Sequence, residues 1–278
     1  MADPYDPARE GATMDFDGRI SYGDMLQLDK LLDAQTDFTE APDGLLFIIQ
    51  HQTSELWMKL MLHEIGGARS AIRNDDLPNA FKLLARVSRI LEQLNNAWDV
   101  LRTMTPSDYT KFRDALGQSS GFQSMQYRLI EFALGNRNVA MIRPHAHEPE
   151  SVAKLENELQ QASLYQEVLR YAARHGMDLP KDVLADPRTT PHSPVPEVQA
   201  MWATVYNDPE NHWTLYEMAE KLVDLEDYFR RWRFNHVTTV ERVIGFKRGT
   251  GGTGGVSYLK RMLDVELFPE LWHVRTDL

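Results

Sequence analysis

The chain has 278 residues, of which 42% are hydrophobic, and this is enough to bury a sizeable core. It contains no cysteine, which excludes disulfides, cysteine-ligated zinc, iron–sulfur clusters and thiol nucleophiles. Its formal net charge of −11 disfavours nucleic acid and anionic membrane surfaces as partners.

The N-terminus has no targeting signal. Residues 1–18 carry several acidic residues and no apolar segment, so they predict a flexible arm rather than a secretory signal. The apolar run Leu45–Ile49 is far shorter than the ~20 residues that span a bilayer. We therefore expect a cytoplasmic protein without a membrane or nucleic-acid partner.

Hydrophobic residues recur with a helical period through most of the chain. The pattern predicts a short helix over residues 22–34 and a long, deeply buried helix from Pro42 to about Arg73. A further amphipathic helix is expected from Asp76 to Met104.

Helix-start signals organise the second half. Thr105 precedes a proline and has an acid three residues on, which predicts a helix ending near Gly117. Shorter helices are expected over 122–134 and 164–175, and five prolines make 178–196 a loop. A cap at Asp208 opens a helix reaching about Phe246. Nothing alternates with period two, so we expect an all-α fold in which residues 19–278 form a single domain of long central helices.

His51 stands in an apolar helix face with Phe47, Met58 and Leu62. A core histidine bonded to a backbone carbonyl is the commoner interpretation of such a residue.

His236 lies in a second apolar face, with Phe229 and Trp232. A haem proximal site needs a neutral imidazole among large apolar side chains, although a core histidine is again the commoner case. Two such histidines favour a ligand role, but their spacing cannot show that they face each other. Without a C-x-x-C-H segment, any haem would be held non-covalently.

Tyr109 and Arg113 are four residues apart and project from one helical face. Arginine suits bidentate binding of a carboxylate, whereas a packed surface arginine is the commoner alternative. The small residues of 117–122 form either a close-approach turn for a ligand or a plain helix stop.

The run Gly245–Gly255 contains six glycines. It formally matches the dinucleotide pattern, but an expected helix rather than a strand precedes it, and no Lys-Ser/Thr follows for a P-loop. A mobile loop that folds over a ligand, with Thr250 as a hydrogen-bonding group, is the favoured interpretation; a solvated linker is the alternative. A single Glu-x-x-His motif, Glu270 to His273, falls short of a di-iron site.

Five segments, in order, resemble bacterial tryptophan 2,3-dioxygenases, a resemblance that spans roughly residues 17–275. The matching segments are Phe47–Trp57 (FIIQHQTSELW), Tyr109 to Asp114 (YxxFRD), Ser119–Ser124 (SSGFQS), Trp232 to His236 (WRFxH) and Gly245–Gly252 (GFKRGTGG).

The resemblance implies an enzyme that opens the indole C2–C3 bond of L-tryptophan with O2. The product is N-formyl-L-kynurenine, and the reaction is the first step of tryptophan catabolism by the kynurenine pathway. It also implies one non-covalent b-type haem per subunit, a haem-binding bundle and a homotetramer. A non-catalytic haem-based sensor or carrier of indoles or gas is the alternative.

Residue roles follow from the same resemblance. His236 is implied as the proximal iron ligand, and His51 as the distal, catalytic histidine that bonds the indole N–H. The other implied site residues are Phe47 and Leu116 (indole pocket), Tyr109 and Arg113 with Phe112 beside them (carboxylate), Thr250 (ammonium and carboxylate), and Trp98, Ser120 and Gly121 (haem pocket).

An N-terminal helix that reaches the neighbouring subunit's site is also implied. Tyr22 and Leu26 match that helix. Met25 stands where a bacterial relative has a second tyrosine, which puts a polar contact at this position in doubt.

Overall fold

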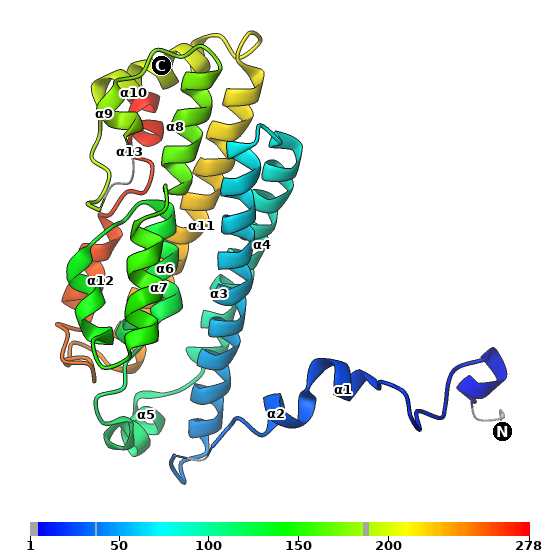
Figure 1. The fold of residues 1–278 in the computed structure, drawn as a ribbon. Helices are drawn as coiled ribbons and strands as arrows, with labels where there is room; N and C mark the ends of the chain where they lie inside the picture. Colours follow the sequence, from blue (N-terminus) through cyan, green and yellow to red (C-terminus); the bar gives the residue numbers. More distant parts are fainter. Residues whose placement is uncertain (1–4, 37, 186–188) are drawn as a thin grey trace. The chain divides into compact units, whose positions relative to one another are not determined.

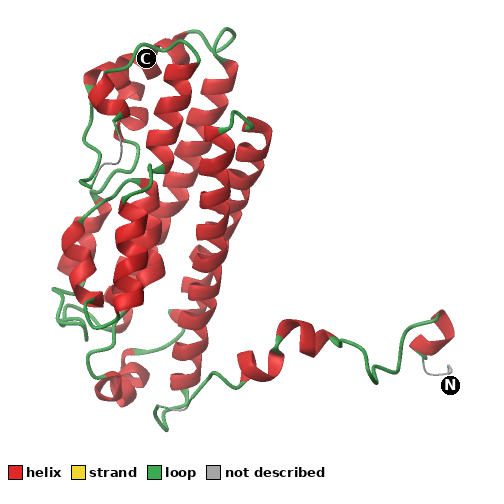
Figure 2. Ribbon diagram, viewed as in Figure 1, coloured by secondary structure: helices red, strands yellow, loops and turns green. Residues whose placement is uncertain are grey.

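The computed structural model describes the chain except for residues 1–4, 37 and 186–188. The fold is all-α: helices joined by loops make up the described residues, and no strand occurs among them (Figure 2). The chain divides into two compact units, residues 1–38 and 39–278.

The first unit holds a 3-10 turn, η1 (Pro7–Glu10), and two short helices, α1 (Tyr22–Leu26) and α2 (Leu28–Leu32). The sequence predicted one helix over 22–34, but Gln27 adopts a left-handed conformation with φ 50° and divides it. None of the described residues of this unit is buried. Its helices are therefore fixed by local capping, such as the reciprocal hydrogen bonds of Ser21 and Asp24, rather than by a core.

Three long helices dominate the second unit. Helix α3 (Asp43–Arg73) runs along α4 (Leu77–Leu101), and α4 runs along α11 (Trp213–Val243) (Figure 1). Helices α6 (Met125–Leu134) and α8 (Leu164–Arg174) pack against α3. The predicted long helices are confirmed, with differences at their ends: α4 ends at Leu101 rather than Met104, and α11 begins at Trp213 rather than just after Asp208 and ends at Val243 rather than near Phe246.

Shorter elements fill the connections. The helix predicted after Thr105 ends as an α-helix at Phe112 and continues as a 3-10 turn, and α9 lies inside the predicted 178–196 loop. The remaining elements are α5 (Pro106–Phe112), η2 (Arg113–Leu116), η3 (Gly121–Gln123), η4 (Val139–His145), α7 (Pro149–Leu159), α9 (Lys181–Leu184), α10 (Pro196–Asn207), α12 (Val256–Leu263), α13 (Pro269–His273) and η5 (Val274–Thr276).

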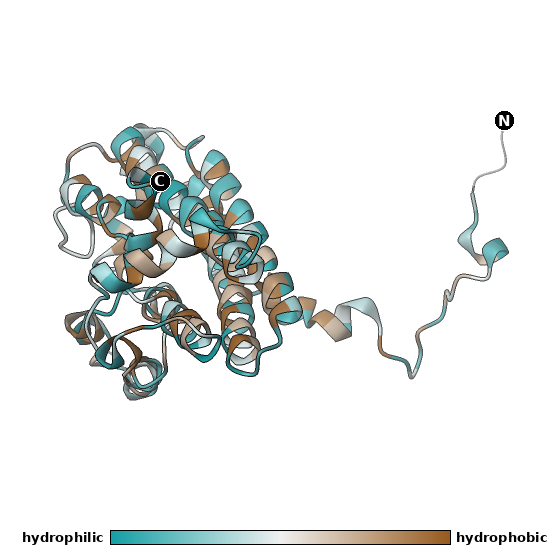
Figure 3. Ribbon diagram, turned by 90° about the horizontal axis from the view of Figure 1, so that it is seen from above, coloured by the Kyte–Doolittle hydropathy of each residue, from teal (hydrophilic) through white to brown (hydrophobic). Residues whose placement is uncertain are grey.

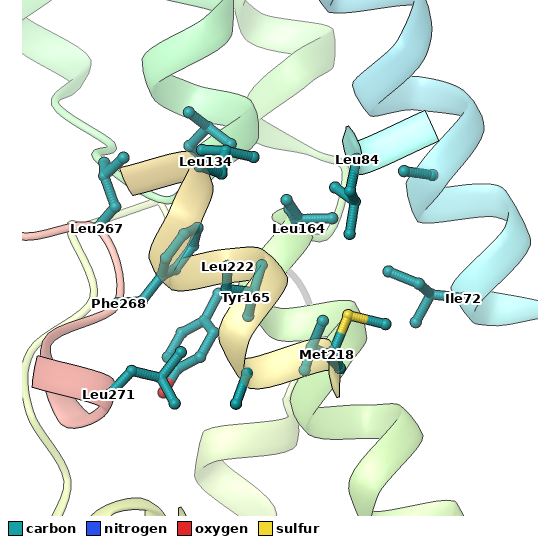
Figure 4. Close-up of a cluster of buried hydrophobic side chains, with 14 of the residues drawn as sticks. Ile72, Leu84, Leu134, Leu164, Tyr165, Met218, Leu222, Leu267, Phe268 and Leu271 are labelled. Atoms are coloured by element: carbon teal, nitrogen blue, oxygen red, sulfur yellow. The ribbon is translucent and has the colours of Figure 1, made fainter. Parts of the chain in front are cut away.

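A large hydrophobic core joins most of these helices, and a smaller cluster of Phe132, Leu155 and Leu159 joins α6 to α7. Figure 4 shows the packing of the large core around Leu222 of α11, with Leu84 and Leu164 from neighbouring helices and Phe268 from the C-terminal segment. Seen from above, the helices carry both hydrophobic and hydrophilic residues (Figure 3), as expected of amphipathic helices with one buried face and one solvent-exposed face. Within the described part of the chain, no helix has the length and apolarity to cross a membrane.

Candidate active site

A cavity of about 250 Å³ opens in the second unit, between helices α3, α4, α6, α11 and α12, the 119–124 segment and the glycine-rich loop. Most of its wall is aliphatic or aromatic. Nine of the side chains singled out from the sequence line it: Phe47, His51, Trp98, Tyr109, Leu116, Ser120, Gly121, His236 and Thr250. The fold thus brings together residues as far apart in the chain as Phe47 and Thr250, which periodicity alone could not show.

His51 has a defined tautomer. Its Nδ1 lies 2.7 Å from the carbonyl oxygen of Phe47, one turn earlier on α3. A carbonyl can only accept, so Nδ1 carries the proton and Nε2 keeps a free lone pair. The ring is accessible where it lines the cavity, yet enough protein surrounds it that burial lowers its pKa, opposed by the Phe47 hydrogen bond and the charge of Glu55. Neutral His51 is therefore a hydrogen-bond acceptor at the cavity wall.

His236 is held neutral more strongly. Burial, with a smaller contribution from the charge of His51, lowers its pKa to about 4. Trp98 stacks on the ring with centroids 4.8 Å apart and planes at 19°, and Trp232 lies 5.6 Å away. Both histidines face one cavity, and each keeps a neutral imidazole at physiological pH.

Arg113 stands just outside the lining residues. Its Nη2 donates to the carbonyl of Arg248 in the glycine-rich loop at 2.7 Å, and its buried Nε has no partner. Tyr109, four residues earlier, is close enough that the guanidinium opposes the rise in tyrosine pKa caused by burial. The pair forms a positively charged rim with unused hydrogen-bonding capacity.

The glycine-rich loop is closed over the 119–121 segment. Thr250 Oγ1 donates to the carbonyl of Ser119 at 2.5 Å. A Cβ at Gly251 would lie 2.7 Å from the Ser120 Cβ, a separation that only glycine permits. The loop therefore makes specific contacts and is not a solvated linker.

A buried charge cluster in the cavity wall was not among the residues predicted from the sequence. Arg128 (4% exposed) and Arg233 (3%) both bond to Glu131 (1%), which also accepts from Tyr127 and Asn136. The Nε atoms of both arginines are buried without a partner. Two cations surround Glu131, so this three-residue cluster carries a net positive charge that an anionic ligand could neutralise, while the Glu55 carboxylate also lines the cavity. Arg128 and Glu131 lie three residues apart, an i, i+3 ion-pair signal that could have found part of the cluster.

These features fit a haem. Iron in a porphyrin needs a single protein ligand, and among the described residues no group of three or more His, Asp or Glu could hold a bare metal ion. A neutral imidazole, an apolar wall and a cationic end match the iron, the ring and the carboxylates of such a cofactor. Glu270 of the Glu-x-x-His motif instead accepts hydrogen bonds from Tyr165, His192 and the Val195 amide.

A helical bundle that encloses an apolar cavity with two neutral histidines and a cationic end defines a class: helical proteins that hold a flat, anionic cofactor beside a substrate. Sequence comparison narrows the class. The model of the tryptophan 2,3-dioxygenase family matches residues 8–176 and 191–278.

Curated relatives agree over nearly the whole chain. Tryptophan 2,3-dioxygenase of Bradyrhizobium diazoefficiens is 67% identical over 99% of this chain and 98% of its own. Those of Ruegeria pomeroyi (62%, 100% of both chains) and Cupriavidus necator (59%, 96% of this chain and 91% of its own) are also similar. The chain belongs to the tryptophan 2,3-dioxygenase family.

Proposed function

We propose that this chain binds one non-covalent b-type haem per subunit in its cavity and uses it to oxidise L-tryptophan with O2 to N-formyl-L-kynurenine. Family membership supports the reaction. The single observation that carries the site is that two neutral histidines from different helices, His51 and His236, face one apolar cavity.

His236 would ligate the iron, because its pKa of about 4 leaves a lone pair available at any physiological pH. Trp98, Ser120 and Gly121 would line the haem, and Arg128 with Arg233 would offset its carboxylate charge. When bound, the haem supplies the binding and activation of O2.

The remaining residues orient tryptophan. The Nε2 lone pair of His51 accepts the indole N–H, while Phe47 and Leu116 pack against the ring. Arg113 and Tyr109 hold the carboxylate at the rim. Thr250 reaches the ammonium and carboxylate from the loop above and excludes water when the loop is closed.

We also propose that the protein acts in the cytoplasm as a homotetramer. Tyr22 and Leu26 would reach the neighbouring subunit's site, and both are exposed within the first unit. A unit whose described residues include no core has apolar side chains available for such a contact.

Turnover of the reduced, haem-loaded protein tests the proposal. With L-tryptophan and air, we expect the absorbance of N-formylkynurenine to grow. Haem that binds tryptophan or O2 without forming product would instead indicate a sensor or carrier.

The iron ligand is tested separately. His236→Ala should purify with little haem, whereas His51→Ala should keep its haem and turn over more slowly. A hydrogen bond to a neutral group is worth about 0.5–1.5 kcal/mol, so the His51 effect is roughly threefold to tenfold. Full haem occupancy with an unchanged spectrum in His236→Ala would overturn the assignment.

A further inference from the structure

Aromatic packing sets the orientation of the His236 ring. Trp98 of α4 covers one face at 4.8 Å, and Trp232 lies beside it at 5.6 Å. Within the described residues, no group hydrogen-bonds to either ring nitrogen. The direction in which the imidazole offers its lone pair therefore depends on where α4 places Trp98.

Trp98 lies in the last turn of its helix. Helix α4 ends at Leu101, three residues beyond Trp98, and the Trp98 carbonyl accepts from the Arg102 amide at 2.9 Å. Such a terminal turn frays unless other contacts hold it. A stable stack on His236 requires that α4 be fixed to α11 at this level.

A pair of amides provides that link. Asn95, one turn before Trp98, donates through Nδ2 to the carbonyls of Leu91 (2.9 Å) and of Tyr228 on α11 (3.1 Å). Its Oδ1 accepts from Asn235 Nδ2 at 2.9 Å. The amide orientations are determined by chemistry, because two carbonyls can only accept and the Asn95 amino group must face them.

A second link lies one turn further along. Arg102 Nη2 donates to Thr239 Oγ1 at 3.3 Å, and Arg242 Nε donates to the Arg102 carbonyl at 3.2 Å. The Trp98–His236 stack is thus bracketed by polar contacts between the same two helices, with Asn95 and Asn235 on one side and Arg102 and Thr239 on the other.

We propose that Asn95 and Asn235 are positioning residues for the proximal histidine. The amide pair fixes the register of α4 on α11, the register fixes Trp98 over the imidazole, and the stack fixes the plane in which His236 meets the iron. This inference rests on the proposed role of His236 as the iron ligand.

The test compares two adjacent asparagines of α4. Asn95→Ala removes the amide link, whereas Asn96→Ala makes the same change at an exposed neighbour, so the difference in helix propensity cancels. In the ferrous haem-loaded protein, we expect Asn95→Ala to shift and broaden the iron–histidine stretching band in the resonance Raman spectrum. Haem transfer to an acceptor apoprotein should accelerate about tenfold, because an unpaired Asn235 amide is left between α4 and α11, beside the His236 stack. Asn96→Ala should change neither.

A double substitution separates a specific link from general loosening. Asn95→Ala combined with Asn235→Ala should be no worse than Asn95→Ala alone, because the bond between them is already lost. If Asn95→Ala does not fold, Asn235→Ala takes its place, since Asn235 contributes only one of the bonds to the link. Additive losses, or an Asn95→Ala band identical to that of Asn96→Ala, would overturn the proposal.

His236→Gly distinguishes failure of this inference from failure of the proposed function. Loss of the iron–histidine band, with recovery on adding imidazole, supports the ligand assignment. A band that persists in His236→Gly would remove that assignment, and the amide pair would then be judged by the crystal structure of Asn95→Ala. Retention there of the 4.8 Å stack would show that the amides do not position Trp98.

Discussion

At the scale of single residues, environment rather than residue type decides what each side chain can do. His51 and His236 are both neutral, but for different purposes. His51 donates its Nδ1 proton to a backbone carbonyl, so its Nε2 is an acceptor. Burial lowers the pKa of His236, so this ring is neutral and has a lone pair suited to a metal.

Arg113 shows how a residue's partners define a testable role. Its Nη2 donates to the loop carbonyl of Arg248, whereas its Nε has no partner, so the guanidinium keeps hydrogen-bonding capacity for a carboxylate. We expect Arg113→Ala to raise KM for L-tryptophan on the order of 100-fold, since losing one partner of a desolvated ion pair costs several kcal/mol.

The matched substrate is tryptamine, which lacks the carboxylate. Its binding should be nearly unchanged by Arg113→Ala, and haem content should stay normal in both cases. Arg113→Lys should recover only part of the affinity, because lysine lacks the bidentate fork. Equal losses for tryptophan and tryptamine would remove Arg113 from the carboxylate site.

At the scale of elements, the glycine-rich loop and the 119–121 segment pack against each other where both line the cavity. Gly251 packs so near Ser120 that any side chain must push the loop outward. The Thr250 hydrogen bond to Ser119 would then be lost.

Gly251→Ala should therefore raise KM for tryptophan several-fold while leaving thermal stability and haem content nearly unchanged. The physical reason is a 2.7 Å approach to the Ser120 Cβ, which is too short for two carbon atoms. Adding Ser120→Gly removes the obstructing atom, so the double variant should regain part of the lost affinity in steady-state kinetics. A double variant as poor as Gly251→Ala would mean that closure depends on something else.

Element prediction succeeded where periodicity was long and failed where local geometry intervened. The hydrophobic patterns of α3, α4 and α11 predicted their courses because each buries a continuous face. The break at Gln27 was missed because a left-handed glutamine has no pattern signature. Helices α7 and α10, of 11 and 12 residues, and the shorter α9, α12 and α13 were not assigned from the sequence.

The site residues could likewise be predicted from the sequence only in part. The resemblance selected nine residues that the fold gathers round one cavity, whereas residue patterns alone left a core histidine as the commoner interpretation of each histidine taken singly. Arg128, Glu131 and Arg233 escaped notice because their significance lies in a three-body contact between α6 and α11. The i, i+3 spacing of Arg128 and Glu131 is visible in the sequence, but their contact with Arg233 depends on tertiary packing.

At the scale of the whole molecule, the burial of His236 makes the stability of the fold depend on pH. The folded state holds His236 with a pKa of about 4, against an ordinary value of 6.5 in an unfolded chain. Between these values the unfolded state binds more protons than the folded state, so stability falls as pH falls. Burial acts in the same direction on the pKa of His51.

We expect the haem-free protein to lose stability as pH drops from about 6.5 towards 4, with no further loss from His236 below its folded pKa. Urea unfolding at a series of pH values measures this slope. His236→Gln, which cannot titrate, should flatten the curve. Identical slopes for the wild type and His236→Gln would contradict the depressed pKa.

The contact between Phe47 and His51 ties substrate shape to acid–base chemistry. Phe47 supplies both a ring that flanks the cavity and the backbone carbonyl that accepts the Nδ1 proton of His51. The centroids of the two rings lie 4.1 Å apart. A bulky indole that displaces Phe47 should therefore also tilt the His51 ring, whose Nε2 accepts the indole N–H. The space available for the indole and the strength of its hydrogen bond thus depend on the same contact. We expect tryptophan analogues with ring substituents to bind more weakly and to turn over more slowly.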